Sequence, residues 1–178
     1  MKKCMFIGTF DPFHNGHLSV VKKLSVDYDI VYVFIAKNYL KMNKRMFSAE
    51  IMQKAIIAAL KENGITNAVC VECSHFLPCS YVSKMLKCKS FCRGMKEEDA
   101  TLNYFLEKIH SVFHIDTVYY NSDCNYSSRK IKKAFLEGKD ISKFVPTSIN
   151  KLFAKKNKTQ RCRRFVSSII SKAQNFAK

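Results

Sequence analysis

The residues with the clearest chemical potential form one continuous stretch near the start of the chain, Gly8-Thr9-Phe10-Asp11-Pro12-Phe13-His14-Asn15-Gly16-His17. The apolar run 4–7 before it predicts a buried strand, and the apolar spacing of residues 18–24 after it predicts a helix. A helix N-terminus offers free N–H groups and a partial positive charge, which suit a phosphate. His14 and His17 would point to the same side of the first turn, where an imidazole can donate to phosphate oxygens. We therefore expect a phosphate-binding loop.

Two histidines at the start of a helix can also cap it without taking part in a reaction. The elements around them help to distinguish these interpretations. Strands are expected at residues 4–7, 29–36, 68–72, 90–92 and 117–120. Helices are expected at residues 18–24, 49–62, 78–86, 99–113 and 126–138. Strands that alternate with helices predict an α/β fold with a doubly wound, five-stranded parallel sheet. Such sheets bind ligands at the carboxyl ends of their strands, where the histidine loop begins.

Composition limits the class of protein. The chain has 178 residues and is 47% hydrophobic, which excludes a disordered protein, and no apolar run is long enough for a membrane helix. We expect no membrane partner and a cytoplasmic location. Cys4, Cys70 and Cys92 lie in strand-like runs, so reduced, buried thiols are expected. The CxxC spacing 70–73 falls on a predicted strand, whose side chains alternate, and no metal site is expected there.

Four segments carry a resemblance to a known family. The stretch 8–17 resembles the (H/T)xGH signature of the nucleotidylyltransferase superfamily. The segments 91–96 (FCRGMK), 126–132 (YSSRKIK) and 140–146 (DISKFVP) are similar to motifs of the bacterial-type phosphopantetheine adenylyltransferases. The resemblance covers about residues 1–155 and implies a Rossmann-like nucleotidylyltransferase domain. It also implies adenylyl transfer from ATP to 4′-phosphopantetheine by direct in-line attack, giving dephospho-coenzyme A and pyrophosphate, with Mg²⁺ as cofactor and a hexameric assembly.

The resemblance also implies roles for individual residues. The catalytic residues would be His17, Lys44 and Arg93. The nucleotide would be held by Gly8, Thr9, Phe10, His14, Gly16, His17, Gly94, Ser127, Ser128 and Lys132. The acceptor would be held by Thr9, Lys41, Lys44, Leu77 and Arg93. Lys41 and Lys44 compete for one role, the lysine that bridges the acceptor and ATP phosphates.

Departures from the family pattern keep alternatives open. Threonine or serine is usual in the subfamily at the place of His14, Lys96 stands where arginine is usual, and Arg129 replaces a Ser/Thr. One alternative is the same chemistry on another acceptor, nicotinate or nicotinamide mononucleotide, or with CTP as donor. The other alternative is a non-catalytic nucleotide- or RNA-binding relative, although we do not expect a nucleic-acid partner.

The C-terminal extension, residues 156–178, lies beyond the resemblance. The net charge of the chain is +17, and about half of the excess lies after residue 150, where there are nine Lys/Arg and no Asp/Glu. Residues 155–160 have no apolar side chain and predict a mobile basic hinge. Phe165, Val166, Ile169 and Ile170 then form one stripe of a predicted helix, which we expect to pack on a subunit surface. On this interpretation catalysis does not depend on the extension.

Overall fold

The computed structural model of the protein describes residues 1–36, 45–72, 79–94, 107–108, 111–112, 114–122, 124 and 126–159. Three residues with predicted roles, Lys41, Lys44 and Leu77, lie outside the described residues, as does the predicted apolar stripe of the extension.

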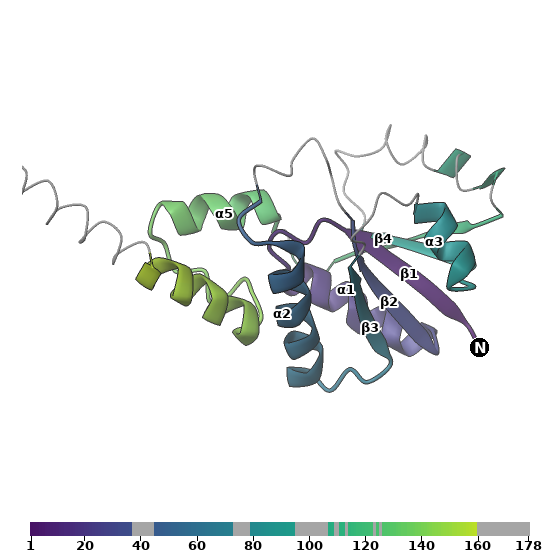
Figure 1. Cartoon of the computed structure of the whole chain (residues 1–178), viewed down its shortest axis with the longest axis horizontal. Coiled ribbons are helices and arrows are strands. Elements are labelled where there is room, and N and C mark those ends of the chain that lie inside the picture. The colour runs from purple at the N-terminus through teal and green to yellow at the C-terminus, as the bar shows by residue number, and fades with distance from the viewer. Residues whose placement is uncertain are drawn as a thin grey trace, which may run out of the picture.

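Five parallel strands form one sheet (Figure 1). They are β1 (Lys3–Gly8), β2 (Ile30–Ile35), β3 (Ala68–Glu72), β4 (Ser90–Gly94) and β5 (Asp116–Tyr120). Their order in the sheet is β3-β2-β1-β4-β5, so successive connections run outward from β1 in both directions. The predicted doubly wound parallel sheet is confirmed. Its topological switch point lies between β1 and β4, which places a ligand crevice beyond the carboxyl ends of these two strands.

Helices connect the strands. They are α1 (Asn15–Asp27), α2 (Ala49–Glu62), α3 (Cys79–Met85) and α5 (Ser128–Leu136), followed by a helix over residues 147–159 that we call the C-terminal helix. The bounds predicted for α2 are confirmed because its end signals act as expected: the Ser48 side chain accepts from the Ile51 N–H, and Gly64 follows in a left-handed conformation (φ +68°). Of the helix predicted over 99–113, residues 107–108 and 111–112 are described, and they are helical.

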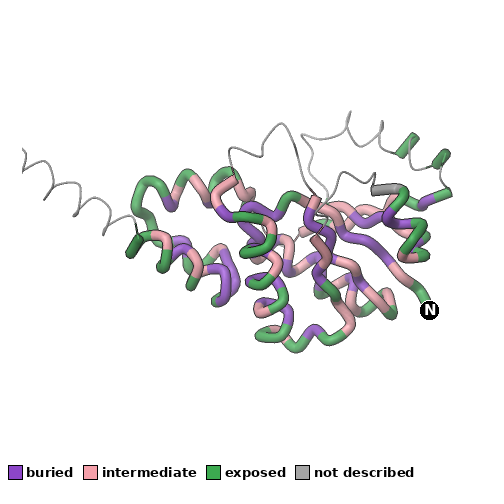
Figure 2. Tube along the Cα trace, in the orientation of Figure 1, coloured by how far each residue is buried: buried purple, intermediate pink, exposed green. Residues whose placement is uncertain are grey.

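Side chains alternate across the sheet and build two cores. On β1, Cys4 and Phe6 join the core beneath α1, α2 and α5, whereas Met5 joins a smaller core beneath α3. Figure 2 shows how the buried residues follow the central strands and the inward sides of the helices. Cys4, Cys70 and Cys92 are free, buried thiols, as predicted. In the described part of the chain, no helix combines the length and apolar character needed to cross a membrane.

The C-terminal helix corrects one prediction. Residues 155–159, which the absence of apolar side chains marked as part of a hinge, are helical. The reason lies upstream, where Ile149 and Phe153, one turn apart, are buried in the main core and fix the helix axis. Ser148 adds two bonds to α2: its hydroxyl donates to the Ala55 carbonyl (3.0 Å) and its N–H to the Glu62 carboxylate (3.1 Å). A helix anchored in this way continues through residues 155–159, although these carry no apolar side chain.

Candidate active site

The turn that leaves β1 is shaped by the Phe10 ring. Phe10 is buried and has a positive φ of 42°, so the chain folds back over the end of the strand. A side chain at Gly8 would place its Cβ 2.7 Å from that ring, which is too close for any residue other than glycine. The turn continues through a cis Asp11–Pro12 peptide to the start of α1. Phe10 therefore packs beneath the loop, while Thr9 is exposed at its tip.

His14 and His17 form a reciprocal cap at the start of α1. Nδ1 of His14 accepts from the Gly16 N–H (3.1 Å), and the His14 N–H donates to Nδ1 of His17 (3.3 Å). Because Nδ1 of His17 accepts a hydrogen bond, the proton of the neutral ring lies on Nε2, which can donate. The two rings are stacked with centroids 3.7 Å apart, so the prediction that they share a side is confirmed.

Aromatic rings surround His17. The ring of Phe10 meets it edge-on with centroids 5.0 Å apart, and Phe13 and Phe6 lie at 5.5 Å and 6.3 Å. His17 itself is half-buried, whereas His14 is buried. Its imidazole is thus held in one orientation by packing and by its Nδ1 bond, which is what a group that must meet a reacting phosphate requires.

Asp11 is the polar centre of the turn. Its carboxylate is buried and accepts from the Met46 N–H (3.1 Å to each oxygen) and from the Phe47 N–H (3.3 Å). It also forms an ion pair with the ammonium of Lys132 on α5. Asp11 therefore joins the β1–α1 turn, the segment before α2, and α5. Lys132, expected at the ATP phosphates, is paired with this carboxylate.

The N-terminus of α5 contacts the same turn. Ser127 caps the helix, its side chain accepting from the Lys130 N–H (3.2 Å). The Ser128 hydroxyl donates to the Pro12 carbonyl (2.9 Å). The first turn of α5 therefore lies beside the first turn of α1, and two helix N-termini converge on one region. Two convergent helix N-termini favour a bound polyphosphate.

Arg93 and Gly94 end β4, the strand next to β1. Phe6 pairs with Cys92, so these two residues leave the sheet beside the end of β1, at the switch point. Arg93 is partly exposed and pairs in register with Tyr119 of β5. Burial raises the pKa of Tyr119 to about 12, so its hydroxyl stays neutral at physiological pH. Arg93 therefore supplies a positive charge at the mouth of the crevice.

The segment 140–146, whose sequence suggested no chemistry, has a structural task. The carbonyls of Phe144 and Lys143 accept from the backbone N–H (2.9 Å) and side-chain amide (3.0 Å) of Asn15. The Phe144 ring also packs against Tyr126, with centroids 4.7 Å apart. The segment thus fixes the first residue of α1 and the approach to α5, which accounts for its place among the family motifs.

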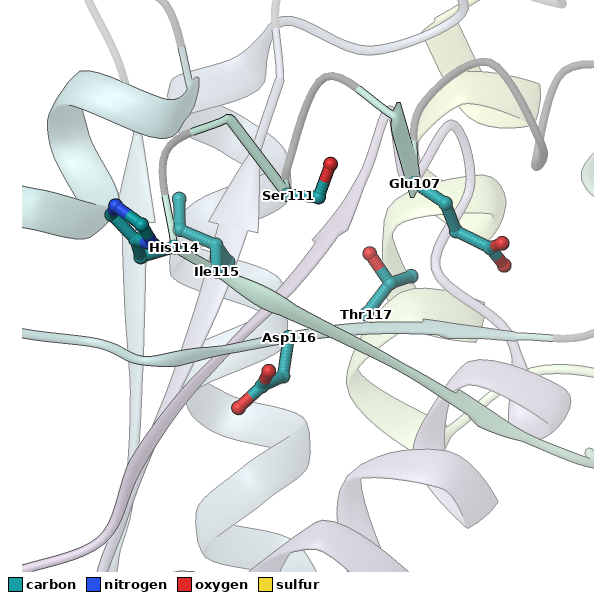
Figure 3. Close-up of a pocket in the computed structure, with 6 residues that line it drawn as sticks. All are labelled: Glu107, Ser111, His114, Ile115, Asp116 and Thr117. Atoms are coloured by element: carbon teal, nitrogen blue, oxygen red, sulfur yellow. The ribbon is translucent and has the colours of Figure 1, made fainter.

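A separate cavity lies away from these groups. It has a volume of about 480 Å³ and is lined by Glu107, Ser111, His114, Ile115, Asp116 and Thr117 (Figure 3). Asp116 is the first residue of β5, so the cavity lies at the amino end of that strand, whereas the predicted site lies at the carboxyl ends. In Figure 3, Asp116 and Thr117 point to opposite sides of the strand. The cavity therefore does not gather the polar groups needed for phosphate chemistry.

Metal-ligating side chains do not cluster in the described part of the chain. No group of three or more His, Cys, Asp or Glu side chains there could hold a metal ion. The one buried carboxylate of the turn, Asp11, is already shared by two backbone N–H groups and Lys132. This donor set does not fit a protein-bound metal.

The structure brings most of the predicted residues together. The β1–α1 turn, the end of β4 and the start of α5 adjoin one another through the contacts above; they carry Gly8, Thr9, Phe10, His14, Gly16, His17, Arg93, Gly94, Ser127, Ser128 and Lys132. Two residues were missed. Asp11 was given no role, and Arg45 proves to donate to the Thr9 carbonyl (3.0 Å). The signal for Asp11 was available, since a carboxylate in a buried aromatic turn needs a cationic partner.

Comparisons with known proteins identify the family of the chain. A family model described as cytidylyltransferase-like matches residues 5–170. A phosphopantetheine adenylyltransferase of Lacticaseibacillus casei is 31% identical over 166 residues, covering 86% of this chain and 93% of its own. Another from Syntrophomonas wolfei is 29% identical over 159 residues, covering 84% and 92%.

Solved structures share the fold. A crystal structure assigned as a nicotinate-nucleotide adenylyltransferase from Vibrio parahaemolyticus matches with a TM-score of 0.65 and 19% identity, covering 86% of this chain and 99% of that one. A bifunctional NMN adenylyltransferase/ADP ribose pyrophosphatase from Francisella tularensis matches with a TM-score of 0.58 and 18% identity, covering 94% and 56%. At these identities the matches establish the fold alone. Because the sequence matches extend over most of its length, the chain belongs to the cytidylyltransferase-like family and, within it, to the phosphopantetheine adenylyltransferases.

Proposed function

We propose that the protein transfers the adenylyl group of ATP to 4′-phosphopantetheine, giving dephospho-coenzyme A and pyrophosphate. Family membership supports the reaction class, and the names of the curated relatives supply the acceptor. The observation that carries the proposal is the orientation of His17. Its Nδ1 accepts the His14 N–H, so the proton of the neutral ring lies on Nε2, and the ring lies in the turn that follows the central strand.

In the proposed reaction an oxygen of the acceptor phosphate attacks the α-phosphorus of ATP. The new O–P bond forms in line with the bond to the pyrophosphate oxygen, which breaks, and the pyrophosphate leaves with its electron pair. His17 donates from Nε2 to an α-phosphate oxygen as negative charge develops there. Arg93 binds the acceptor phosphate, so that its charge lowers the repulsion between two anionic reactants.

The triphosphate tail is proposed to lie at the start of α5. Ser127 and Ser128 lie at that N-terminus, and Lys132 follows on the same helix one turn later. Because Lys132 is paired with Asp11, the β- and γ-phosphates would compete with that carboxylate for the ammonium. The bridging lysine would come from Lys41 or Lys44, which lie outside the described residues.

Mg²⁺ is proposed to arrive with ATP. Mg²⁺ keeps most of its waters and is commonly bound through substrate phosphates with few protein ligands. The donor set around Asp11 is consistent with a metal carried by the nucleotide. We also propose a homo-oligomer, a hexamer by resemblance, in the cytoplasm; light scattering of the purified protein tests the assembly, and cell fractionation tests the location.

The acceptor is tested by parallel assays, each with one candidate substrate. The protein is incubated with ATP and one of 4′-phosphopantetheine, nicotinate mononucleotide or nicotinamide mononucleotide, and in a fourth arm with CTP replacing ATP. We expect pyrophosphate release together with dephospho-coenzyme A, identified by mass spectrometry, in the first arm. Faster turnover of a mononucleotide or of CTP would overturn the proposed substrate pair. Absence of turnover in every arm would overturn the enzymatic function.

A further inference from the structure

Lys156 of the C-terminal helix makes a polar contact with the segment that precedes α2. The ammonium of Lys156 donates to the Met46 carbonyl (2.9 Å) and lies 5.3 Å from the centroid of the Phe47 ring. A charge-assisted hydrogen bond and a cation–π contact therefore act on two consecutive residues. Lys156 is half-buried, unlike its neighbours Lys155 and Lys158, which are exposed.

The position of Lys156 is fixed by the body of its helix. Phe153, one turn earlier on the inward side, packs edge-on against Phe47 (5.0 Å) and against Phe135 of α5 (4.7 Å). Figure 1 shows the helix beside α5 and close to the start of α2. The packing of this helix therefore fixes the position from which the Lys156 ammonium reaches the Met46 carbonyl.

Met46 is held from both ends of its backbone. Its carbonyl accepts from Lys156, while its N–H donates to Asp11, whose carboxylate also receives the Phe47 N–H. Asp11 in turn pairs with Lys132. These contacts form a continuous polar chain, Lys156–Met46–Asp11–Lys132, that runs from the C-terminal helix to the start of α5.

This series of polar contacts affects how strongly Asp11 binds Lys132. The two backbone N–H groups share the negative charge of Asp11 with Lys132. If the Met46 segment moves away, the buried carboxylate keeps Lys132 as its main partner and binds it more strongly. A triphosphate would then have to compete harder for the same ammonium.

We propose that Lys156 is a positioning residue of the nucleotide site, which holds the Met46 segment against Asp11 and so keeps Lys132 available to the phosphates of ATP. This inference rests on the proposed function for the ligand of Lys132. Lys156 belongs to the extension 156–178, and the sequence predicted that catalysis does not depend on that extension. The proposal gives one of its residues a role at the nucleotide site.

The test compares Lys156→Met, which keeps the stem and removes the charge, with Lys156→Arg, which keeps the donor and the cation–π contact. Lys155→Met is the matched control, one position earlier and exposed. Amide hydrogen exchange at Met46 and Phe47 is measured without substrates, and the Kd of ATP is measured by calorimetry without acceptor. In Lys156→Met we expect the exchange rates and the Kd of ATP each to rise about tenfold, the scale expected for the loss of one charge-assisted hydrogen bond. Lys156→Arg and Lys155→Met should resemble the parent.

Kinetics separate positioning from general support. With the acceptor present, the KM of ATP should rise in Lys156→Met while the KM of the acceptor stays the same. A fall in thermal stability with unchanged ATP affinity, or an equal effect from Lys155→Met, would overturn the proposal. Because ATP binding is measured without an acceptor, a wrong acceptor would leave this result standing while the proposed function failed.

Discussion

The imidazole rings of His14 and His17 lie stacked, 3.7 Å between centroids, and each ring uses Nδ1 to accept a backbone N–H of the same helix turn. His14 therefore acts as the N-cap of α1, and its ring packs against the His17 ring. The two histidines have different tasks: the buried one holds the turn, and the half-buried one is placed to reach a ligand.

Replacement of the cap tests this division. His14→Thr should retain most of the turnover, because a hydroxyl can accept the Gly16 N–H as the imidazole does. His14→Ala should lower the free energy of unfolding by about 1 kcal/mol and disturb the packing of His17. Urea unfolding and steady-state kinetics of both variants check the prediction. Equal loss of turnover in the two variants would contradict a capping role.

Two glycines at the ends of neighbouring strands offer a matched pair. Gly8→Ala would place Cβ 2.7 Å from the Phe10 ring, so we expect a loss of about 1–3 kcal/mol in the free energy of unfolding. Gly94→Ala meets no atom of the described residues within 4 Å and should leave stability nearly unchanged. If a nucleotide approaches the backbone at Gly94, this second variant should weaken ATP binding alone. Calorimetric binding and thermal melts separate the effects, and a stable Gly8→Ala protein would refute the steric argument.

Asp11 is expected to control Lys132. In Asp11→Asn the ammonium loses its counter-charge, so the free energy of unfolding should fall by about 1–3 kcal/mol. Without its competitor, ATP should bind at least as tightly as in the parent, while kcat falls because Lys132 is no longer positioned. The control is Asp27→Asn, an exposed carboxylate that accepts from the Tyr120 hydroxyl at the far end of α1. Weaker ATP binding in Asp11→Asn would show that the carboxylate helps the nucleotide instead of competing with it.

Alkaline pH should destabilise the protein through its buried thiols. Burial raises the pKa of Cys70 from 9.0 to about 12. The thiol therefore ionises more readily in the unfolded chain, and its contribution to stability, present below pH 9, is lost as the pH rises from 9 towards 12. Urea unfolding at pH 8 and pH 10 should show lower stability at pH 10, and Cys70→Val should reduce the difference. An unchanged difference in that variant would remove Cys70 as a cause.

Much of the fold followed from local patterns in the sequence. The five strands were visible as short apolar runs, and α2 was delimited by Ser48 and by Asn63-Gly64, which act through neighbouring backbone groups. The β1–α1 turn was equally readable because its glycines, histidines and helix start are adjacent in the chain.

Contacts between distant segments were beyond the sequence. Asp11 and Lys132 are 121 residues apart, and Lys156 and Met46 are 110 apart, so no local spacing reveals either pair. The basic character of residues 155–159 predicted a hinge because long-range packing of Phe153 could not be foreseen. Tertiary contacts therefore decided that residues 155–159 are helical and that Lys156 reaches the Met46 carbonyl.

Replacement of His17 tests whether its imidazole assists adenylyl transfer to 4′-phosphopantetheine. Formation of dephospho-coenzyme A is followed in parent and His17→Ala proteins at saturating substrates, with ATP affinity measured in parallel. We expect kcat to fall on the order of 10²–10³-fold, as for the loss of one donor to a developing charge, while ATP affinity changes far less. A His17→Ala protein that kept most of its turnover would rule out this role for His17.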